Sequence, residues 1–133
     1  MEDASHGPIS ARAEEVATAV VDAAIKVHRA LGPGLLESVY EACLCYELSK
    51  RGIPYRRQVS LHVRYEEVFI ETGFRLDVLV DECVIVELKS TEAIVPIHEA
   101  QLLTHLKLAN VRLGFILNFN VPLMKQRIKR MVI

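Results

Sequence analysis

The sequence of 133 residues predicts an α/β fold, a single domain in which helices flank a mixed sheet of about four or five strands. Three observations support this prediction. Apolar residues recur at helical spacing over residues 11–31. Runs rich in β-branched residues follow one another over residues 59–89, as in a meander of antiparallel strands. A later apolar run, residues 111–118, comes after a helical segment and indicates a crossover to a parallel strand.

The composition is typical of a compact soluble protein, with 51% apolar and 25% charged residues. No apolar run approaches the roughly 18–20 residues that a membrane helix needs, and the polar N-terminus does not resemble a signal peptide. The formal net charge of −1 argues against a generic polyanion binder. The three cysteines lack metal-site spacing, so we expect structural thiols.

The N-terminal part predicts two helices in succession. The first nine residues look frayed, and residues 10–133 form the predicted domain. Ser10 is the expected N-cap of a helix over residues 11–31. The turn Gly32-Pro33-Gly34 ends this helix, because proline cannot continue it and glycine tolerates a positive φ. A second helix is predicted from about residue 35 to residue 51.

The rest of the chain supplies the sheet and one further helix. Apolar and polar residues alternate from Val59 to Tyr65, which indicates a strand with one wet face. A third helix is predicted from Ile97 to Leu108, and residues 122–130 fit either a last short helix or a turn that leads to a terminal strand. The predicted strands are residues 59–65, 68–70, 74–80, 84–89 and 111–118.

Residues 74–90 organise the chain, since two apolar runs there flank a turn and also carry ionisable residues. Strand side chains alternate, so Glu87 and Lys89 share a face, and Asp77 falls roughly across the hairpin from Glu87. Two carboxylates and an ammonium would then meet at the end of a buried sheet. Isolated buried charges are very costly, so such a cluster is either paired internally or bound to a ligand.

The spacing leaves two interpretations of this cluster open. In the first, Mg²⁺ binds the carboxylates of Asp77 and Glu87 together with waters and a substrate phosphate, and Lys89 stabilises phosphate charge or orients a water. In the second, Lys89 forms a structural ion pair with Asp77 or Glu87 on a half-exposed strand.

Asp77 followed by Glu87-Leu88-Lys89 on adjacent strands resembles the core of the PD-(D/E)XK nuclease superfamily. More narrowly, Gly34-Leu35-Leu36-Glu37-Ser38-Val39-Tyr40 resembles the motif of small bacterial and archaeal proteins called GxxExxY proteins. The resemblance implies a restriction-endonuclease-like core. Together with the odd number of cysteines, it also implies a cytoplasmic protein with reduced thiols. It continues through Gly52-Ile53-Pro54, Gln58-Val59, Gly73-Phe74-Arg75-Leu76-Asp77, His98-Glu99-Ala100-Gln101-Leu102-Leu103 and Gly114-Phe115-Ile116-Leu117-Asn118-Phe119-Asn120.

The superfamily resemblance implies a Mg²⁺-dependent nuclease that cuts DNA phosphodiesters, with Mn²⁺ as a substitute metal. It implies that Asp77, Glu87 and the carbonyl of Leu88 hold the metal. It further implies that Lys89 orients the attacking water or stabilises charge on the phosphate.

Two helices contribute further candidates. Related folds take an acidic residue from a helix before the sheet, which implies a role for Glu37; without the motif, Glu37 is a first-turn glutamate favoured by the helix dipole. Several nuclease families of this fold carry a glutamine followed four residues later by tyrosine, which implies a role for Gln101. His105 stands where that tyrosine is expected, and His105 and His98 are weaker candidates than Gln101.

Nucleic acid, DNA above all, is the implied partner, and basic clusters would follow its phosphate backbone. The alternative is a set of solvated charges that balance an acidic front half. Small nucleases of this fold often pair to cut two strands, which raises a homodimer as an alternative to a monomer. Two other functions stay open: an inactive module that binds nucleic acid or a protein partner, and a metal-dependent enzyme acting on a smaller phosphate ester. The clustered basic residues are Lys107, Arg112, Lys125, Arg127, Lys129 and Arg130 toward the C-terminus, and Lys50, Arg51, Arg56 and Arg57 before the sheet.

Overall fold

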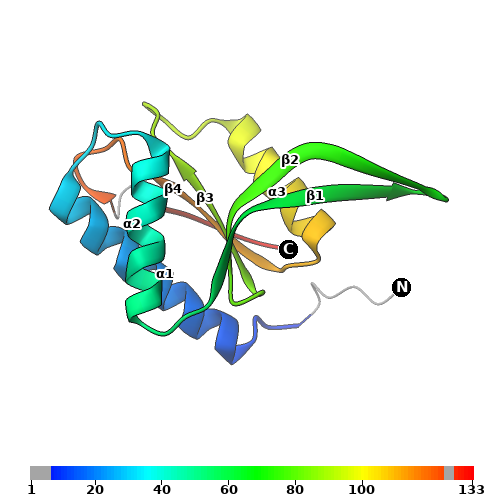
Figure 1. The fold of residues 1–133 in the computed structure, drawn as a ribbon, viewed down its shortest axis with the longest axis horizontal. Helices are drawn as coiled ribbons and strands as arrows, with labels where there is room; N and C mark the ends of the chain where they lie inside the picture. Colours follow the sequence, from blue (N-terminus) through cyan, green and yellow to red (C-terminus); the bar gives the residue numbers. More distant parts are fainter. Residues whose placement is uncertain (1–6, 125–127) are drawn as a thin grey trace.

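The computed structural model describes residues 7–124 and 128–133, and it confirms a mixed five-stranded sheet flanked by three helices (Figure 1). The predictions for residues 1–6, Lys125 and Arg127 lie outside the described residues. The elements are α1 (Ala11–Leu31), α2 (Glu37–Lys50), β1 (Tyr55–Tyr65), β2 (Val68–Val80), β3 (Val84–Lys89), α3 (Pro96–Ala109), β4 (Leu113–Asn118) and β5 (Ile128–Val132).

Local sequence signals explain where α1 begins and ends. The Ser10 hydroxyl accepts a hydrogen bond from the Ala13 amide, which confirms Ser10 as the N-cap of α1. Gly32 follows α1 at φ 69°, a conformation that glycine adopts without steric cost. Among the described residues, no helix is both long and apolar enough to cross a bilayer.

The strands follow chain order across the sheet, β1-β2-β3-β4-β5. Strands β3 and β4 are parallel and the other neighbours are antiparallel, as the helix between β3 and β4 predicts. The sequence suggested two separate strands around Gly73, but β2 passes through it at φ 80° as one irregular strand. The last segment forms a terminal strand, β5, rather than a helix.

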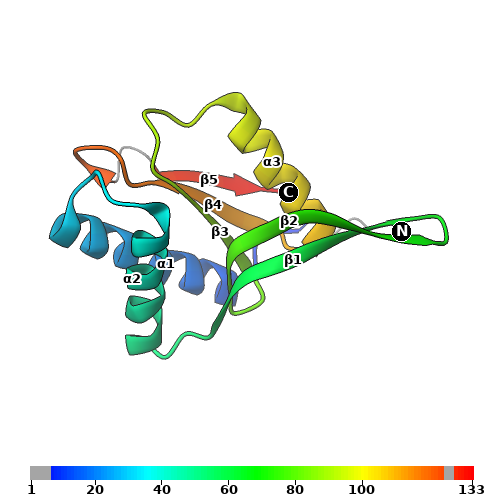
Figure 2. The same ribbon diagram turned by 45° about the horizontal axis from the view of Figure 1, so that its top comes forward.

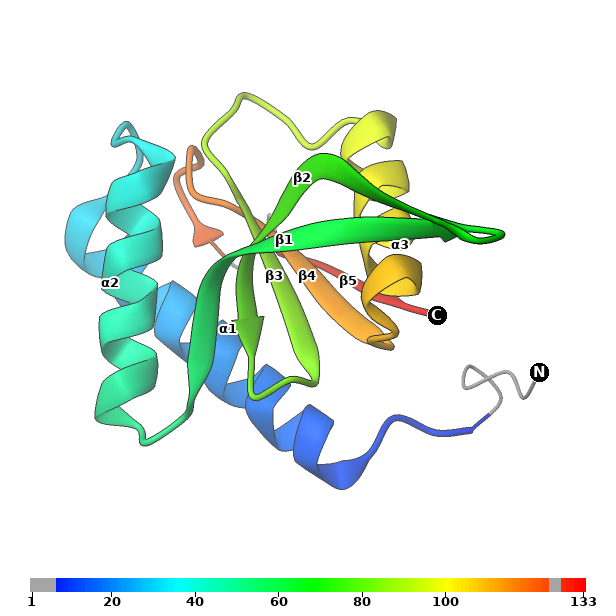
Figure 3. The same ribbon diagram turned by 45° about the vertical axis from the view of Figure 1, so that its right-hand side comes forward.

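Helices cover both faces of the sheet, and each face has its own apolar core. Helices α1 and α2 pack on one face, where Val78, Val86 and Leu88 point, and α3 packs on the other face over Ile85 and Ile116. Figures 2 and 3 show α3 and the α1–α2 pair on opposite sides of the sheet. The central strands β3 and β4 are therefore buried almost throughout, as expected for strands covered on both faces.

Gly114 marks the closest approach of α3 to the sheet. A Cβ atom there would meet Leu102 Cδ1 and Leu106 Cδ2 at 3.1 Å and the Ile85 carbonyl oxygen at 3.2 Å. The carbonyl belongs to the neighbouring strand, so it cannot rotate away. Gly114→Ala should therefore lower the free energy of unfolding by about 1–3 kcal/mol, measured by urea denaturation. Gly7→Ala, at a position with open space, is the control; equal stability of the two variants would contradict this prediction.

The β1–β2 ribbon changes faces partway along its length. Tyr55 belongs to the core under α1 and α2, whereas Val59 and Leu61 belong to the core under α3. Gln58, between them, has φ 52°, and its neighbours Arg57 and Val59 pair with Val78 and Leu76 on either side of Asp77. Beyond this point the ribbon projects from the body of the molecule (Figure 1). Asp77 thus lies where the ribbon crosses between the two layers.

Candidate active site

Asp77 and Leu88 meet where β2 leaves β3. The last paired residues of these two strands are Val78 and Val86. At the next residue, Asp77, β2 separates from β3 and stays paired with β1. The Asp77 carboxylate then accepts a hydrogen bond that a backbone carbonyl of β2 would otherwise accept. Asp77 Oδ2 accepts a hydrogen bond of 2.8 Å from the Leu88 amide. The predicted opposition of Asp77 and the Glu87–Lys89 segment is therefore present in the structure.

The same strand geometry orients the carbonyl of Leu88. Within one strand residue, the N–H and the C=O point to the same side, and successive residues alternate. The Lys89 carbonyl faces β4 and accepts from the Phe119 amide at 2.9 Å. The Leu88 carbonyl therefore faces away from β4, toward the side on which Asp77 lies. A carboxylate and a strand carbonyl are both oxygen ligands of the kind that Mg²⁺ prefers.

Glu87 contributes a carboxylate that is buried and only partly satisfied. Its side chain lies on the α3 face, and Glu87 Oε2 is 3.6 Å from Nδ1 of His105. Both residues are less than 9% exposed, and neither of these two atoms has a hydrogen-bond partner in the described structure. Buried polar atoms are nearly always satisfied, so this carboxylate oxygen is open to a cation or a water.

The electrostatics at this end of the sheet are dominated by negative charge. Burial raises the pKa of Asp77 to about 6, and the charge of Glu87 adds to the rise, while the Leu88 amide opposes it. Glu41 and Glu37 raise the pKa further. A bound cation would offset this repulsion.

Lys89 is the last residue of β3 and is partly exposed. In the described part of the chain, it forms no ion pair with Asp77, Glu87 or another carboxylate within 4.0 Å. The structural ion pair considered from the sequence is therefore not formed here. The Lys89 ammonium remains available to a ligand.

The structure brings Glu37 to the site, whereas Gln101 makes no hydrogen bond to it within the described residues. Glu37 lies in the first turn of α2, and its Oε2 accepts from the Ser90 amide at 3.2 Å, directly after Lys89. Gln101 is exposed on α3 and forms no hydrogen bond or ion pair within the described residues. His98 accepts from the Val95 amide and caps α3. The functional roles of Glu37 and Gln101 stay predictions.

Two buried residues that sequence analysis did not select support the site. Glu41 accepts hydrogen bonds from Arg57 Nε at 2.8 Å and from Gln58 Nε2 at 2.9 Å, which holds the ribbon next to Asp77. Asn118, fully buried at the end of β4, accepts from the Thr91 and Asn120 amides. A polar residue that ends an apolar strand was the available signal for Asn118. For Glu41 the available signal was its position four residues after Glu37, on the same face of the helix.

Most of the predicted phosphate-binding cations are already paired with carboxylates. Lys129 is 4.0 Å from Glu99. Arg130 bonds Glu14 through two nitrogens. Before the sheet, the ion pairs are Arg56 with Glu82, Arg57 with Glu41, and both Lys50 and Arg51 with Glu47. These pairs favour the interpretation of balancing charges over a continuous phosphate track.

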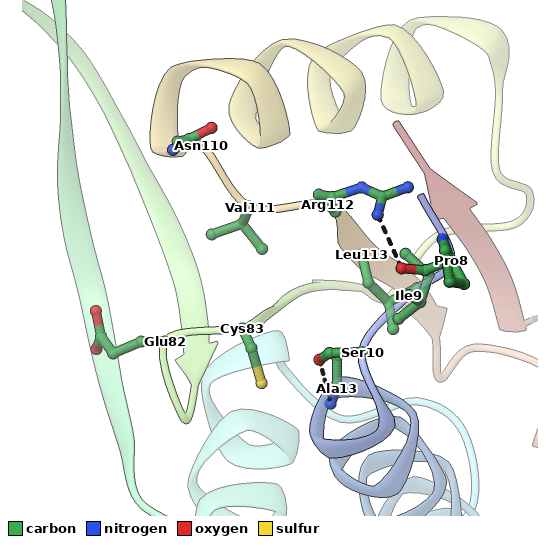
Figure 4. A pocket seen from close by; sticks show the side chains of 10 residues that line it. All are labelled: Pro8, Ile9, Ser10, Ala13, Glu82, Cys83, Asn110, Val111, Arg112 and Leu113. Carbon is green, nitrogen blue, oxygen red and sulfur yellow. Dashed lines mark hydrogen bonds between the residues drawn. The ribbon is translucent and has the colours of Figure 1, made fainter. Parts of the chain in front are cut away.

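Two hollows border opposite ends of the sheet. One of about 400 Å³ adjoins the candidate site between the start of α2 and Ser90. The other, of about 260 Å³, lies near the start of β3 and β4, lined by Ser10, Cys83 and Arg112 among others (Figure 4). Because Asp77 and Glu87 lie at the far end of β3, the second hollow is remote from the carboxylates.

Within residues 7–124 and 128–133, no group of three or more His, Cys, Asp or Glu side chains is arranged to hold a metal ion. The site offers instead two carboxylates and one backbone carbonyl. Mg²⁺ commonly binds one or two carboxylates and keeps several waters, so this smaller ligand set fits it better than a site for Zn²⁺.

A mixed sheet between helices makes this an α/β protein, with Asp77 where β2 separates from β3 and with Glu87 and Lys89 at the end of β3. A family model described as the PD-(D/E)XK nuclease superfamily matches residues 14–131, and the chain belongs to this superfamily. No curated protein and no solved structure shows a significant match to this chain. The narrower resemblance to GxxExxY proteins stays a prediction.

Proposed function

We propose that this protein is a divalent-metal-dependent nuclease that hydrolyses phosphodiester bonds in nucleic acid, with DNA as the first substrate to test. The observation that carries the proposal is the buried, unpartnered Oε2 of Glu87 beside the raised-pKa carboxylate of Asp77. Membership of the nuclease superfamily supports the same chemistry.

Asp77, Glu87 and the carbonyl of Leu88 would hold Mg²⁺, or Mn²⁺ in its place. Such an ion supplies positive charge to the scissile phosphate and to the attacking water. Glu87 lies on the buried strand β3, and the hydrogen bond from the Leu88 amide holds the Asp77 carboxylate next to that strand, so both carboxylates are positioned before a metal binds.

Lys89 and the neighbouring helices complete the chemistry. The Lys89 ammonium, with no carboxylate neighbour within the described residues, would donate hydrogen bonds to a phosphate oxygen or to the attacking water. Glu37 restrains the Ser90 amide and so fixes the backbone that follows Lys89. His105 packs beside Glu87 and limits the positions of its carboxylate.

The direct test is cleavage by the purified protein of labelled single-stranded and duplex DNA, single-stranded RNA and a small phosphodiester. Each substrate is incubated with Mg²⁺, Mn²⁺ or EDTA. We expect metal-dependent cleavage of nucleic acid that EDTA abolishes. Metal-dependent turnover of the small ester alone would replace the proposal by a small-molecule phosphodiesterase, and binding without cleavage under all conditions would replace it by an inactive nuclease-fold module.

A further inference from the structure

An aromatic side chain stands exposed at the rim of the candidate active site. Phe74 precedes Asp77 by three residues on β2 and is 52% exposed. Its ring centroid is 5.8 Å from that of His105, and His105 Nδ1 is 3.6 Å from Glu87 Oε2. His105 therefore neighbours both the exposed Phe74 ring and the Glu87 carboxylate.

The residues beside Phe74 suit a nucleotide. Arg75 is exposed and, within the described residues, forms no ion pair. On the α2 side of the site, Leu36 is 74% exposed next to the hollow that contains Glu37 and Ser90. The acidic centre is thus bordered by an aromatic ring and an apolar side chain, and one available guanidinium follows the ring on β2. An aromatic ring beside few available cations matches a base rather than a row of phosphates.

The charges around the site argue against a clamp for duplex DNA. Binding to a duplex backbone depends on many Lys and Arg contacts to phosphates. Here Arg57 forms an ion pair with Glu41. Arg56 and Arg51 are paired with Glu82 and Glu47 in the same way. A single strand also exposes its bases, and a base stacked on an aromatic side chain contributes affinity that an intact duplex cannot supply.

We propose that the site takes nucleic acid that is unpaired at the position of cleavage, with one base stacked on Phe74. This inference rests on the proposed function and specifies its substrate class, a single strand or the unpaired end of a duplex. An intact duplex hides its bases from Phe74, so the ring would contribute nothing to binding it.

The test measures binding apart from catalysis. Fluorescence anisotropy in EDTA and in Ca²⁺ compares a labelled oligothymidylate of about 15 nucleotides, a length that covers one typical single-strand site, with a duplex of equal length. The wild type should prefer the single strand. Phe74→Leu keeps an apolar side chain but removes the π face, and it should weaken single-strand binding by about tenfold without changing duplex binding. Phe74→Tyr should restore affinity to within about twofold.

Phe69→Leu is the matched control. Phe69 is an exposed aromatic residue on the same ribbon, but it stacks on His62 away from the carboxylates. Its substitution should leave both affinities unchanged, and thermal melts should show all three variants folded. Equal affinity of the wild type for both oligonucleotides, no measurable binding, an unaffected Phe74→Leu variant, or a loss in Phe69→Leu equal to that in Phe74→Leu would each overturn the stacking inference. Metal-dependent cleavage of the duplex alone would also overturn it while leaving the proposed nuclease function intact.

Discussion

Lys89→Ala and Glu87→Gln should each reduce metal-dependent cleavage by at least about 100-fold, the scale expected when a group that stabilises transition-state charge is removed. The two variants should differ in metal binding. Glu87→Gln removes a carboxylate ligand and should weaken Mn²⁺ binding in calorimetry, whereas Lys89→Ala should retain it, because Lys89 does not contact the metal in the proposed site.

Lys26→Ala provides the matched control for Lys89→Ala. Lys26 is an exposed lysine on α1 that pairs with Glu47, near the end of α2 opposite to Glu37. Its variant should cleave at the wild-type rate. Wild-type cleavage by folded Lys89→Ala would exclude Lys89 from the chemistry, and wild-type cleavage by Glu87→Gln would defeat the proposed metal site.

Asp77→Asn should stabilise the metal-free protein by on the order of 1 kcal/mol at pH 7.5. The folded-state pKa of Asp77 is raised to about 6 from 3.8, because burial and then Glu87 disfavour its charge. A raised pKa means that the stabilising contribution is complete below about pH 3.8 and is lost as the pH rises through about 6. The ionised carboxylate therefore destabilises the fold at pH 7.5, and asparagine removes the charge while keeping an acceptor for the Leu88 amide.

In Mg²⁺ the wild type should become more stable than Asp77→Asn. Mg²⁺ stabilises whichever protein binds it, so the melting temperature of the wild type should rise with Mg²⁺ concentration and that of Asp77→Asn much less. The variant should also lose cleavage. Asp22→Asn, at an exposed position of α1, controls for the loss of one charge and should change stability by less than about 0.5 kcal/mol in either condition. A lower melting temperature of Asp77→Asn in EDTA would mean that Asp77 stabilises the fold and would contradict the metal-site proposal.

Much of the fold followed from local patterns. The α1 boundaries and the Ser10 cap were predicted correctly, because a helical stripe and a capping side chain depend only on neighbouring residues. The parallel direction of β4 relative to one of the meander strands was predicted from the helix that precedes it, and the structure identifies that strand as β3. The irregular course of β2 was not predicted. Gly73 looks like a strand break until the pairing of β2 with β1 on both sides of this glycine is known.

The candidate site, like the fold, was predicted only in part from the sequence. The sequence by itself determined that Asp77 lies opposite the segment from Glu87 to Lys89, because a two-residue period and a tight turn set the register of a hairpin. Only the tertiary structure decided what surrounds them. The ribbon twists at Gln58, α3 brings His105 to Glu87, and Glu41 reaches the ribbon from α2. These contacts join residues far apart in the chain, and their geometry depends on how helices pack on each face, which no local period encodes.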